Sequence, residues 1–252
     1  MMDREHSLTF TVRNCEIGPH QGAHVRSLLD YLQETADSQI RDLGVTIQEL
    51  MERGLYWVLS AYRLEVARYP RAGEAVTVRT WHSGRQGRFY LRDFLVLDAR
   101  GKHLAAATTS WALIDKVKGT HVNGQRPIPD LPLLQAKATE RGLEHLPALD
   151  APVHSDCFRV GSGSIDMYNH VNHVFYIQWA LDSLRLKVPA AALPVSIEAV
   201  FRNAAVEGDR LRVAFKKAEG EKVWLHAVTR ENDGEELVRL RTRWEGMGAG
   251  GQ

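Results

Sequence analysis

The chain is poor in cysteine, in long apolar runs and in net charge. Its only two cysteines, Cys15 and Cys157, show no metal-type spacing. No apolar run approaches the roughly 18 residues needed to span a bilayer, and Met1–Thr9 is charged and lacks an apolar signal core. Because 32 Lys and Arg residues balance 31 Asp and Glu residues, phosphate-driven binding of nucleic acid is disfavoured. These absences predict a cytoplasmic protein with reduced cysteines.

Recognisable cofactor sites are also missing. The sequence contains no phosphate-binding P-loop, no dinucleotide-binding glycine fingerprint and no cluster of zinc ligands, so we expect neither a cofactor nor a metal. What is present is the ordinary mixture of a globular protein, 44% hydrophobic and 25% charged. The length of 252 residues suits one large domain or two of modest size.

The pattern of the first half predicts a strand, a long helix and four more strands. Alternating side chains predict a strand over residues 8–16. Apolar side chains at three- and four-residue steps predict an amphipathic helix over Ser27–Asp42, where Ser27 and Asp30 resemble a capping box and Gly44 ends the helix. Four strands separated by turn signals are predicted over Tyr56–Tyr69, Glu74–Trp81, Arg88–Leu97 and Leu104–Asp115.

The same order of elements restarts after a stretch of different composition. Residues Lys118–Pro152 are rich in proline, glycine and charge, which predicts a connector with a short helix near Leu133–Arg141. A strand is then predicted over Cys157–Val160 and a helix over Asn172–Leu186, with Asn172 as its N-cap. The remaining predicted strands are Val195–Phe201, Arg210–Lys216, Lys222–Arg230 and Glu236–Trp244. The predicted domains are 1–130 and 153–252, joined by a connector over 131–152.

Two matching sets of elements indicate an internal duplication. Tyr31-Leu32-Gln33 and Tyr176-Ile177-Gln178 would occupy matching helix positions. Ala72-Gly73-Glu74 and Glu207-Gly208-Asp209 would precede matching strands. A long helix wrapped by an open antiparallel sheet is the hotdog architecture. The predicted fold class is therefore α+β, a double hotdog of two tandem units.

Polar residues gather just before the second predicted helix. Within seven residues lie Asp166, Tyr168, Asn169, His170 and Asn172. A carboxylate can position or deprotonate a water molecule, and main-chain N–H groups at a helix start can hold the oxyanion formed when water attacks a thioester carbonyl. The D-x-x-x-H-V-N pattern resembles the active-site segment of hotdog-fold thioesterases, which closes a strand and opens the central helix.

Asp166 is the leading candidate for the catalytic carboxylate. It would act as a general base on water or as a nucleophile through an acyl anhydride; the competing interpretation is a turn residue that bonds its own backbone. His170 would act as a second base, as a donor to the thioester oxygen or as a structural partner of Asp166. Asn172 is expected to cap the helix first and to line the site second. Asn169 and Tyr168 are further candidates, through their amide and hydroxyl groups.

The chain resembles the acyl-acyl-carrier-protein thioesterases of plants and bacteria. The resemblance covers Phe10–Pro129 and Phe158–Glu207. In the first half it is carried by Arg13, Glu16-Ile17-Gly18, Leu32-Gln33-Glu34-Thr35-Ala36, Trp57-Val58, Arg68-Tyr69-Pro70, Gly73, Thr80-Trp81, Ala107-Thr108 and Trp111. The resemblance implies a double hotdog that hydrolyses the thioester between a fatty acyl chain and the phosphopantetheine of acyl carrier protein.

Departures from the family pattern bear on the mechanism. The plant motif reads D-x-N-x-H-x-N, whereas Tyr168 stands at its middle amide position here. The plant enzymes also carry a Glu-Cys pair on the next strand, where this chain has Ala204 and Ala205, so a cysteine nucleophile is not expected. The motif is closer to that of single-hotdog acyl-coenzyme A thioesterases. The first-half segment Gly18–His24 has no carboxylate, which predicts one site per chain.

The resemblance also suggests where substrate and carrier bind. The first half would supply the acyl pocket, with Trp57, Leu59, Tyr62 and Trp111 as candidate lining residues. Glu34, on the first predicted helix, would approach the site, although a helical glutamate is by default exposed and a strand aromatic is by default ordinary core. A basic rim for an acidic carrier protein is suggested by Arg85, Arg88, Arg92, Lys116 and Lys118.

Several functions stay open at the level of sequence. The leading hypothesis is a fatty acyl-acyl-carrier-protein thioesterase with acyl carrier protein as its partner. The alternatives are an acyl-coenzyme A thioesterase of the same fold and a non-catalytic acyl-binding hotdog protein. A hotdog hydratase is less favoured, because its acid–histidine spacing is one residue longer than that of Asp166 and His170. No nucleic-acid partner and no membrane span are expected, and a homodimer is a further expectation.

Overall fold

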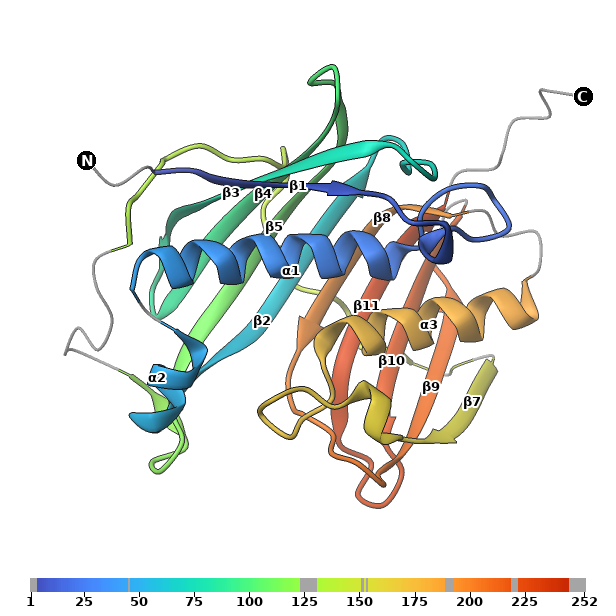
Figure 1. Ribbon diagram of the computed structural model, residues 1–252. Helices are drawn as coiled ribbons and strands as arrows, with labels where there is room; N and C mark the ends of the chain where they lie inside the picture. The colour runs from blue at the N-terminus through green and yellow to red at the C-terminus, as the bar shows by residue number, and fades with distance from the viewer. Residues whose placement is uncertain are drawn as a thin grey trace, which may run out of the picture. The chain divides into compact units, whose positions relative to one another are not determined.

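The chain folds into two compact units that divide at Leu143 and Glu144, inside the segment expected to be a connector. The computed structural model describes residues 4–44, 46–122, 131–150, 152, 154–188, 193–218 and 222–244. Each unit is one long helix packed against one side of an antiparallel sheet (Figure 1). No helix within these described ranges is both long enough and apolar enough to cross a membrane.

The first unit is built on the helix α1 (Val25–Asp42), which packs against strands β1 and β3. Its sheet has the strand order β1-β3-β4-β5-β2, with β6 paired to β5. The strands are β1 (His6–Thr11), β2 (Leu55–Val66), β3 (Ala75–Gln86), β4 (Phe89–Asp98), β5 (His103–Asp115) and β6 (Thr120–His121). Buried Leu28, Leu29 and Leu32 of α1 face this sheet, which explains the apolar spacing in the sequence.

The second unit repeats this plan around the helix α3 (His173–Lys187), which packs on β9, β10 and β11. Its sheet has the order β8-β11-β10-β9-β7. The strands are β7 (His154–Arg159), β8 (Pro194–Phe201), β9 (Arg210–Lys217), β10 (Val223–Arg230) and β11 (Glu236–Trp244). Because β7, β9, β10, β11 and β8 take the places of β1, β3, β4, β5 and β2, the fold is the double hotdog that the sequence predicts.

Matched hydrogen bonds fix the correspondence between the units. Gly73 N–H donates to Val12 O, and Gly208 N–H donates to Val160 O, with φ positive at both glycines. This confirms the pairing of Ala72-Gly73-Glu74 with Glu207-Gly208-Asp209. The two long helices begin at Val25 and His173, which are 148 residues apart.

The predicted match between Tyr31-Leu32-Gln33 and Tyr176-Ile177-Gln178 is wrong by three residues. A spacing of 148 between the helices pairs Tyr31 with Trp179, whereas the tripeptides beginning at Tyr31 and Tyr176 are 145 apart. The tyrosines also make different contacts: Tyr31 Oη donates to Glu16, and Tyr176 Oη accepts from Ala205 N–H. Three residues are nearly one helical turn, so the two tripeptides share a face without being equivalent.

The start of α1 corrects a second prediction. Its N-cap is His24, which makes no side-chain cap bond, and Ser27 lies buried inside the first turn. Ser27 and Asp30 therefore do not form a capping box. A real one occurs in α2 (Ile47–Glu52), a short helix that the sequence analysis missed: Thr46 Oγ1 accepts from Glu49 N–H, and the Glu49 carboxylate accepts from Thr46 N–H.

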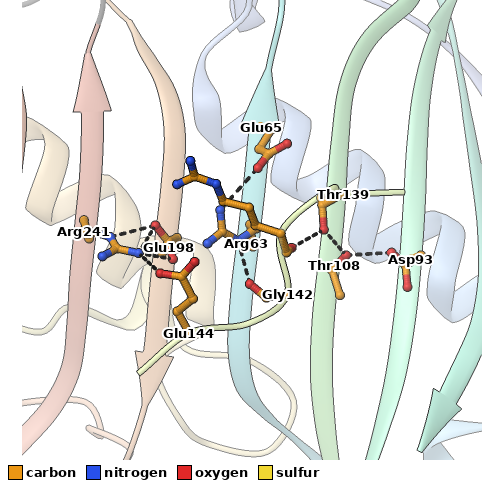
Figure 2. A network of polar contacts seen from close by, with 10 residues as sticks. Arg63, Glu65, Asp93, Thr108, Thr139, Gly142, Glu144, Glu198 and Arg241 are labelled. Atoms are coloured by element: carbon orange, nitrogen blue, oxygen red, sulfur yellow. Dashed lines mark hydrogen bonds and ion pairs between the residues drawn. The ribbon is translucent and has the colours of Figure 1, made fainter. Parts of the chain in front are cut away.

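The predicted short helix near Leu133–Arg141 is wrong, because this segment is irregular and contains no helical turn. Its backbone is held on the outer face of the first sheet, the side opposite α1. Trp81 Nε1 donates to Ala136 O at 2.8 Å, and Asp93 Oδ1 accepts from Ala138 N–H at 2.9 Å. Arg63 Nε donates to Gly142 O at 3.0 Å, a contact drawn in Figure 2. Strand side chains thus take up the hydrogen-bonding groups that a helix would have paired internally.

The second unit holds its own part of the connector in the same manner. On the outer face of its sheet, the Arg241 guanidinium donates to both oxygens of Glu198 and to Glu144 (Figure 2). Arg239 Nη1 donates to Leu146 O at 2.7 Å. The first unit therefore binds the connector between Leu134 and Gly142, and the second unit binds it at Glu144 and Leu146.

Candidate active site

The motif residues form a tight loop between β7 and α3. An isolated bridge joins Ile165 to Val171, and Asp166 N–H donates to His170 O at 2.8 Å. Asn169 N–H donates to Asp166 O at 3.0 Å, and Asn169 has a φ of 61°. Asparagine tolerates this left-handed conformation better than most residues, which explains its place at the turn.

The carboxylate of Asp166 is half committed to this loop. Its Oδ1 accepts the main-chain N–H of Tyr168 at 2.8 Å and that of His170 at 3.3 Å. The turn interpretation of Asp166 is therefore correct for one oxygen. Oδ2 meets no hydrogen-bond donor among the residues that the structure describes. A partly buried carboxylate with one fixed and one available oxygen is suited to positioning and deprotonating a water molecule.

The other polar residues of the loop differ in exposure. The imidazole of His170 is partly exposed, and it makes no side-chain hydrogen bond within the described ranges. Its link to Asp166 runs through the main chain, so the ring is available for a substrate. Asn169 is exposed, and Tyr168 is partly buried. All three side chains belong to the loop that holds Asp166.

Asn172 is the N-cap of α3, as predicted. Its Oδ1 accepts from Val174 N–H at 3.1 Å, and its own N–H donates to Ser164 O at 2.9 Å. The cap fixes the angle at which the loop enters the helix. Burial lowers the pKa of the neighbouring His173 to about 4, which keeps that imidazole neutral at physiological pH.

A backing segment, Ala204–Ala205, supports the loop from behind. Val171 N–H donates to Ala205 O at 2.9 Å, and Ala205 N–H donates to Tyr176 Oη at 2.7 Å. Arg230 Nη2 donates to Ala204 O at 2.8 Å. Ala205 is fully buried, and neither alanine side chain can act as a nucleophile.

The equivalent loop of the first unit has the same backbone hydrogen bonds but no carboxylate. Gly18 N–H donates to Gly22 O and Gln21 has a φ of 58°, matching Asp166 and Asn169. Gly18 thus occupies the position of Asp166. A Cβ atom added to Gly18 would lie 2.9 Å from Cε1 of His24, so the His24 ring fills the space that a carboxylate would need.

Of the predicted substrate-binding residues of the first unit, Trp57 and Trp111 lie near each other and Glu34 does not join them. Tyr90, which packs against Trp57, pairs across the sheet with Trp111. Glu34 is on the exposed side of α1, where its Oε1 accepts from Arg41 Nη2 at 2.9 Å. Trp57 packs edge-on against Tyr90 in an apolar cluster with Leu50, Leu55 and Leu113. Trp111 is partly buried, and its Nε1 donates to Thr109 Oγ1 at 2.8 Å.

Two charged residues of the first unit were misjudged or missed. Arg92, expected in a basic rim, is buried at 7% exposure beneath α1 and cannot meet a carrier protein. Asp37, which had no motif to mark it, lies partly buried on α1, where desolvation and then the charge of Glu34 raise its pKa to about 6. Helical periodicity alone would have shown only that Asp37 adjoins the apolar stripe.

The fold and the carboxylate loop together define a double-hotdog protein in which one of the two equivalent loops carries an aspartate. Models of the acyl-ACP thioesterase N-terminal and C-terminal domains match residues 3–122 and 151–246. The chain therefore belongs to the acyl-ACP thioesterase family.

Individual relatives are similar over nearly the whole chain. An acyl-acyl-carrier-protein hydrolase of Cuphea viscosissima is 28% identical over 261 residues, covering 96% of this chain and 63% of the relative. The palmitoyl-acyl carrier protein thioesterase of Gossypium hirsutum is 29% identical, covering 94% and 63%. Both relatives are described as chloroplastic. The chain thus spans less than two thirds of the length of these curated relatives.

Solved structures confirm the fold. An acyl-ACP thioesterase from Bacteroides thetaiotaomicron superimposes with a TM-score of 0.84 at 22% identity, covering 96% of this chain and 98% of the other. The 12:0-ACP thioesterase from Umbellularia californica gives a TM-score of 0.84 at 21% identity, covering 98% and 99%.

Proposed function

We propose that this chain hydrolyses the thioester between a fatty acyl chain and acyl carrier protein, releasing the free fatty acid. The family match over both units supports the reaction class. The observation that carries the assignment to a site is Asp166, whose Oδ1 is held by the Tyr168 N–H while Oδ2 is left for chemistry. Asp166 is the only carboxylate in either of the two equivalent loops.

In the proposed mechanism Asp166 acts as a general base. Oδ2 takes a proton from water as the water oxygen bonds to the thioester carbonyl carbon, forming a tetrahedral oxyanion. Collapse of this intermediate breaks the C–S bond, and the sulfur leaves as a thiol after receiving a proton from Asp166. No metal or redox partner is required for this balance. Attack by Asp166 itself through an acyl anhydride is the alternative route with the same products.

The neighbouring residues would assist this step. His170 is placed to donate a hydrogen bond to the carbonyl oxygen as negative charge develops there. Asn172 positions the loop through its cap, and Tyr176 and Arg230 position it through the backing segment. Tyr168 and Asn169 would complete the wall of the site. We expect no nucleophilic role for either cysteine, because both are exposed and neither lies in the motif loop.

A panel of thioesters tests the proposal. Free-thiol release would be followed with acyl-carrier-protein and acyl-coenzyme A esters from C8 to C18. We expect turnover of carrier-protein substrates to exceed that of coenzyme A esters of equal chain length. The reverse ranking would assign the chain to the coenzyme A thioesterases, and no hydrolysis of either class would indicate a non-catalytic acyl-binding protein. Cytoplasmic location and homodimer formation stay predictions.

A further inference from the structure

A row of polar side chains crosses the helix-facing side of the first sheet. Arg92 of β4 lies directly opposite His82 of β3 and Thr109 of β5, and Thr109 lies opposite Tyr62 of β2. All four are buried, at 7%, 7%, 1% and 3% exposure for Arg92, His82, Thr109 and Tyr62. Because they occupy one level on four neighbouring strands, they form a continuous polar row beneath α1.

The Arg92 guanidinium in this row is only partly satisfied. Its Nη1 donates to Gln39 Oε1 at 2.6 Å and to Thr80 Oγ1 at 3.1 Å. Nε and Nη2, which carry the other three N–H groups, meet no acceptor among the described residues. No described carboxylate lies within ion-pair distance, and Asp37 acts on Arg92 only from further away.

Burial lowers the pKa of Arg92 to about 10, so the group stays charged at physiological pH. A buried charge without an opposing charge destabilises the fold. Nε and Nη2 are not among the fully buried unpaired atoms, so water or a ligand can serve as the acceptor that the protein does not provide.

His82 supplies a complementary acceptor next to these donors. Its Nδ1 is 2.9 Å from Leu91 O, and since a carbonyl only accepts, Nδ1 carries the proton. Burial lowers the pKa of His82, and the positive charge of Arg92 lowers it further, so the ring is neutral and Nε2 is an acceptor. No donor to Nε2 is found within the described ranges. Arg92 and His82 thus present donors and an acceptor on adjacent strands.

The second unit shows that the fold itself does not require this row. At the equivalent level its strands carry Ile197, Thr242, Trp224 and Lys217. Trp224 takes the place of Arg92, and Ile197 that of Tyr62. The threonine is common to both units and in each accepts from a tryptophan Nε1 two residues later, so the alignment is secure. What distinguishes the first unit is the unpaired guanidinium and its histidine neighbour.

We propose that the polar row binds an oxygen substituent on the acyl chain of the substrate, a hydroxyl or a carbonyl group. This inference rests on the proposed function and on the expectation, from the family resemblance, that the first unit supplies the acyl pocket. A hydroxyl oxygen would accept from Arg92 and donate to His82 Nε2, and a carbonyl oxygen would accept from Arg92. A plain hydrocarbon chain would leave both residues unsatisfied, so the row discriminates against it.

The test compares acyl-carrier-protein thioesters of equal length, from C8 to C16, with and without oxygen. The oxygenated series would carry 3-hydroxyl, 3-oxo or terminal hydroxyl groups. For at least one of them we expect kcat/KM to exceed that of the plain chain by about 10-fold or more. Arg92→Met should bring kcat/KM of the oxygenated series down to that of the plain chain of equal length.

Arg63→Met is the matched control, because Arg63 is a buried arginine on the outer face of the same sheet. It should weaken the fold and keep the preference. If Arg92→Met does not fold, His82→Phe and Gln39→Leu test the same row. Equal turnover of plain and oxygenated chains by the wild type would overturn the inference while leaving the proposed function intact. Failure to hydrolyse any acyl chain would instead refute the proposed function.

Discussion

The Oδ1 atom of Asp166 accepts the main-chain N–H of Tyr168 at 2.8 Å. This contact fixes the direction of the carboxylate and leaves its second oxygen for a water molecule. The same turn contacts recur at Asp98 of the first unit, whose Oδ1 accepts from Arg100 N–H and from Lys102 N–H, each at 2.9 Å. A turn contact of this kind is therefore compatible with catalysis but does not by itself indicate it.

His226 should make the protein less stable in mild acid. Its ring is fully buried; Nε2 is 2.8 Å from Thr242 Oγ1, and Nδ1 has no partner in the described part of the chain. Burial lowers its pKa to about 3, against about 6.5 in an unfolded chain. As pH falls from 6.5 toward 3, the unfolded chain binds a proton that the folded chain excludes. Stability should drop by about 1.4 kcal/mol per pH unit from this group.

His226→Phe isolates this effect, because the equivalent position in the first unit is Phe94. Denaturant unfolding at pH 7.5 and pH 5 should show a wild-type loss about 2 kcal/mol larger than that of the variant. Parallel pH dependence in the two proteins would contradict the assignment.

Asp37 should make the protein less stable as pH rises from mildly acidic to neutral. Its folded-state pKa of about 6 lies above the ordinary 3.8, so the folded chain holds the proton more tightly than the unfolded chain. Stability from this group is present below pH 3.8 and is lost as pH rises to about 6. Asp37→Asn removes the buried charge and should raise the unfolding free energy at pH 7.5 by up to about 3 kcal/mol, with little change at pH 4. Urea titrations at both pH values check this, and an equal effect at each would argue against it.

Introducing a carboxylate into the Gly18–His24 loop of the first unit should destabilise the protein unless His24 is also changed. Gly18→Asp places a Cβ atom against the His24 ring and should cost about 1 kcal/mol or more. His24→Asn, which copies the Asn172 cap of the second unit, should recover most of this loss. A double-mutant cycle of unfolding free energies measures the coupling. Strictly additive effects would mean that the ring does not occupy the carboxylate position.

Periodicity and turn residues were enough to predict both long helices and the principal strands. Gly73, Gly208 and the Asn172 cap act locally, so their effects can be read from short stretches of sequence. The irregular conformation of the connector over Leu133–Arg141 could not be predicted, because its hydrogen-bond partners Trp81, Asp93 and Arg63 are distant in sequence. Helix propensity was the only signal there, and tertiary hydrogen bonds overrode it.

The candidate site divides in the same way. Asp166, His170 and Asn172 form one contiguous motif, and the structure keeps them together in one loop. Arg92 carried no local signal for burial. Its surroundings depend on strand register and on the packing of α1, which places Gln39 above it. A charged residue in a strand therefore suggested an exposed rim where the structure has a buried row.

The most direct test of the account is hydrolysis by Asp166→Asn. Asparagine retains the oxygen that accepts the Tyr168 N–H and removes the base, so the loop should fold as before. Asp98→Asn makes the same change in a matching turn of the first unit, where Oδ1 accepts from Arg100 N–H and Lys102 N–H, and serves as the control. With the preferred acyl-carrier-protein substrate, the account predicts that kcat of Asp166→Asn falls by about 10²–10⁴, while kcat of Asp98→Asn and both melting curves stay near wild type. Near-wild-type hydrolysis by Asp166→Asn with a normal melting curve would contradict the carboxylate mechanism.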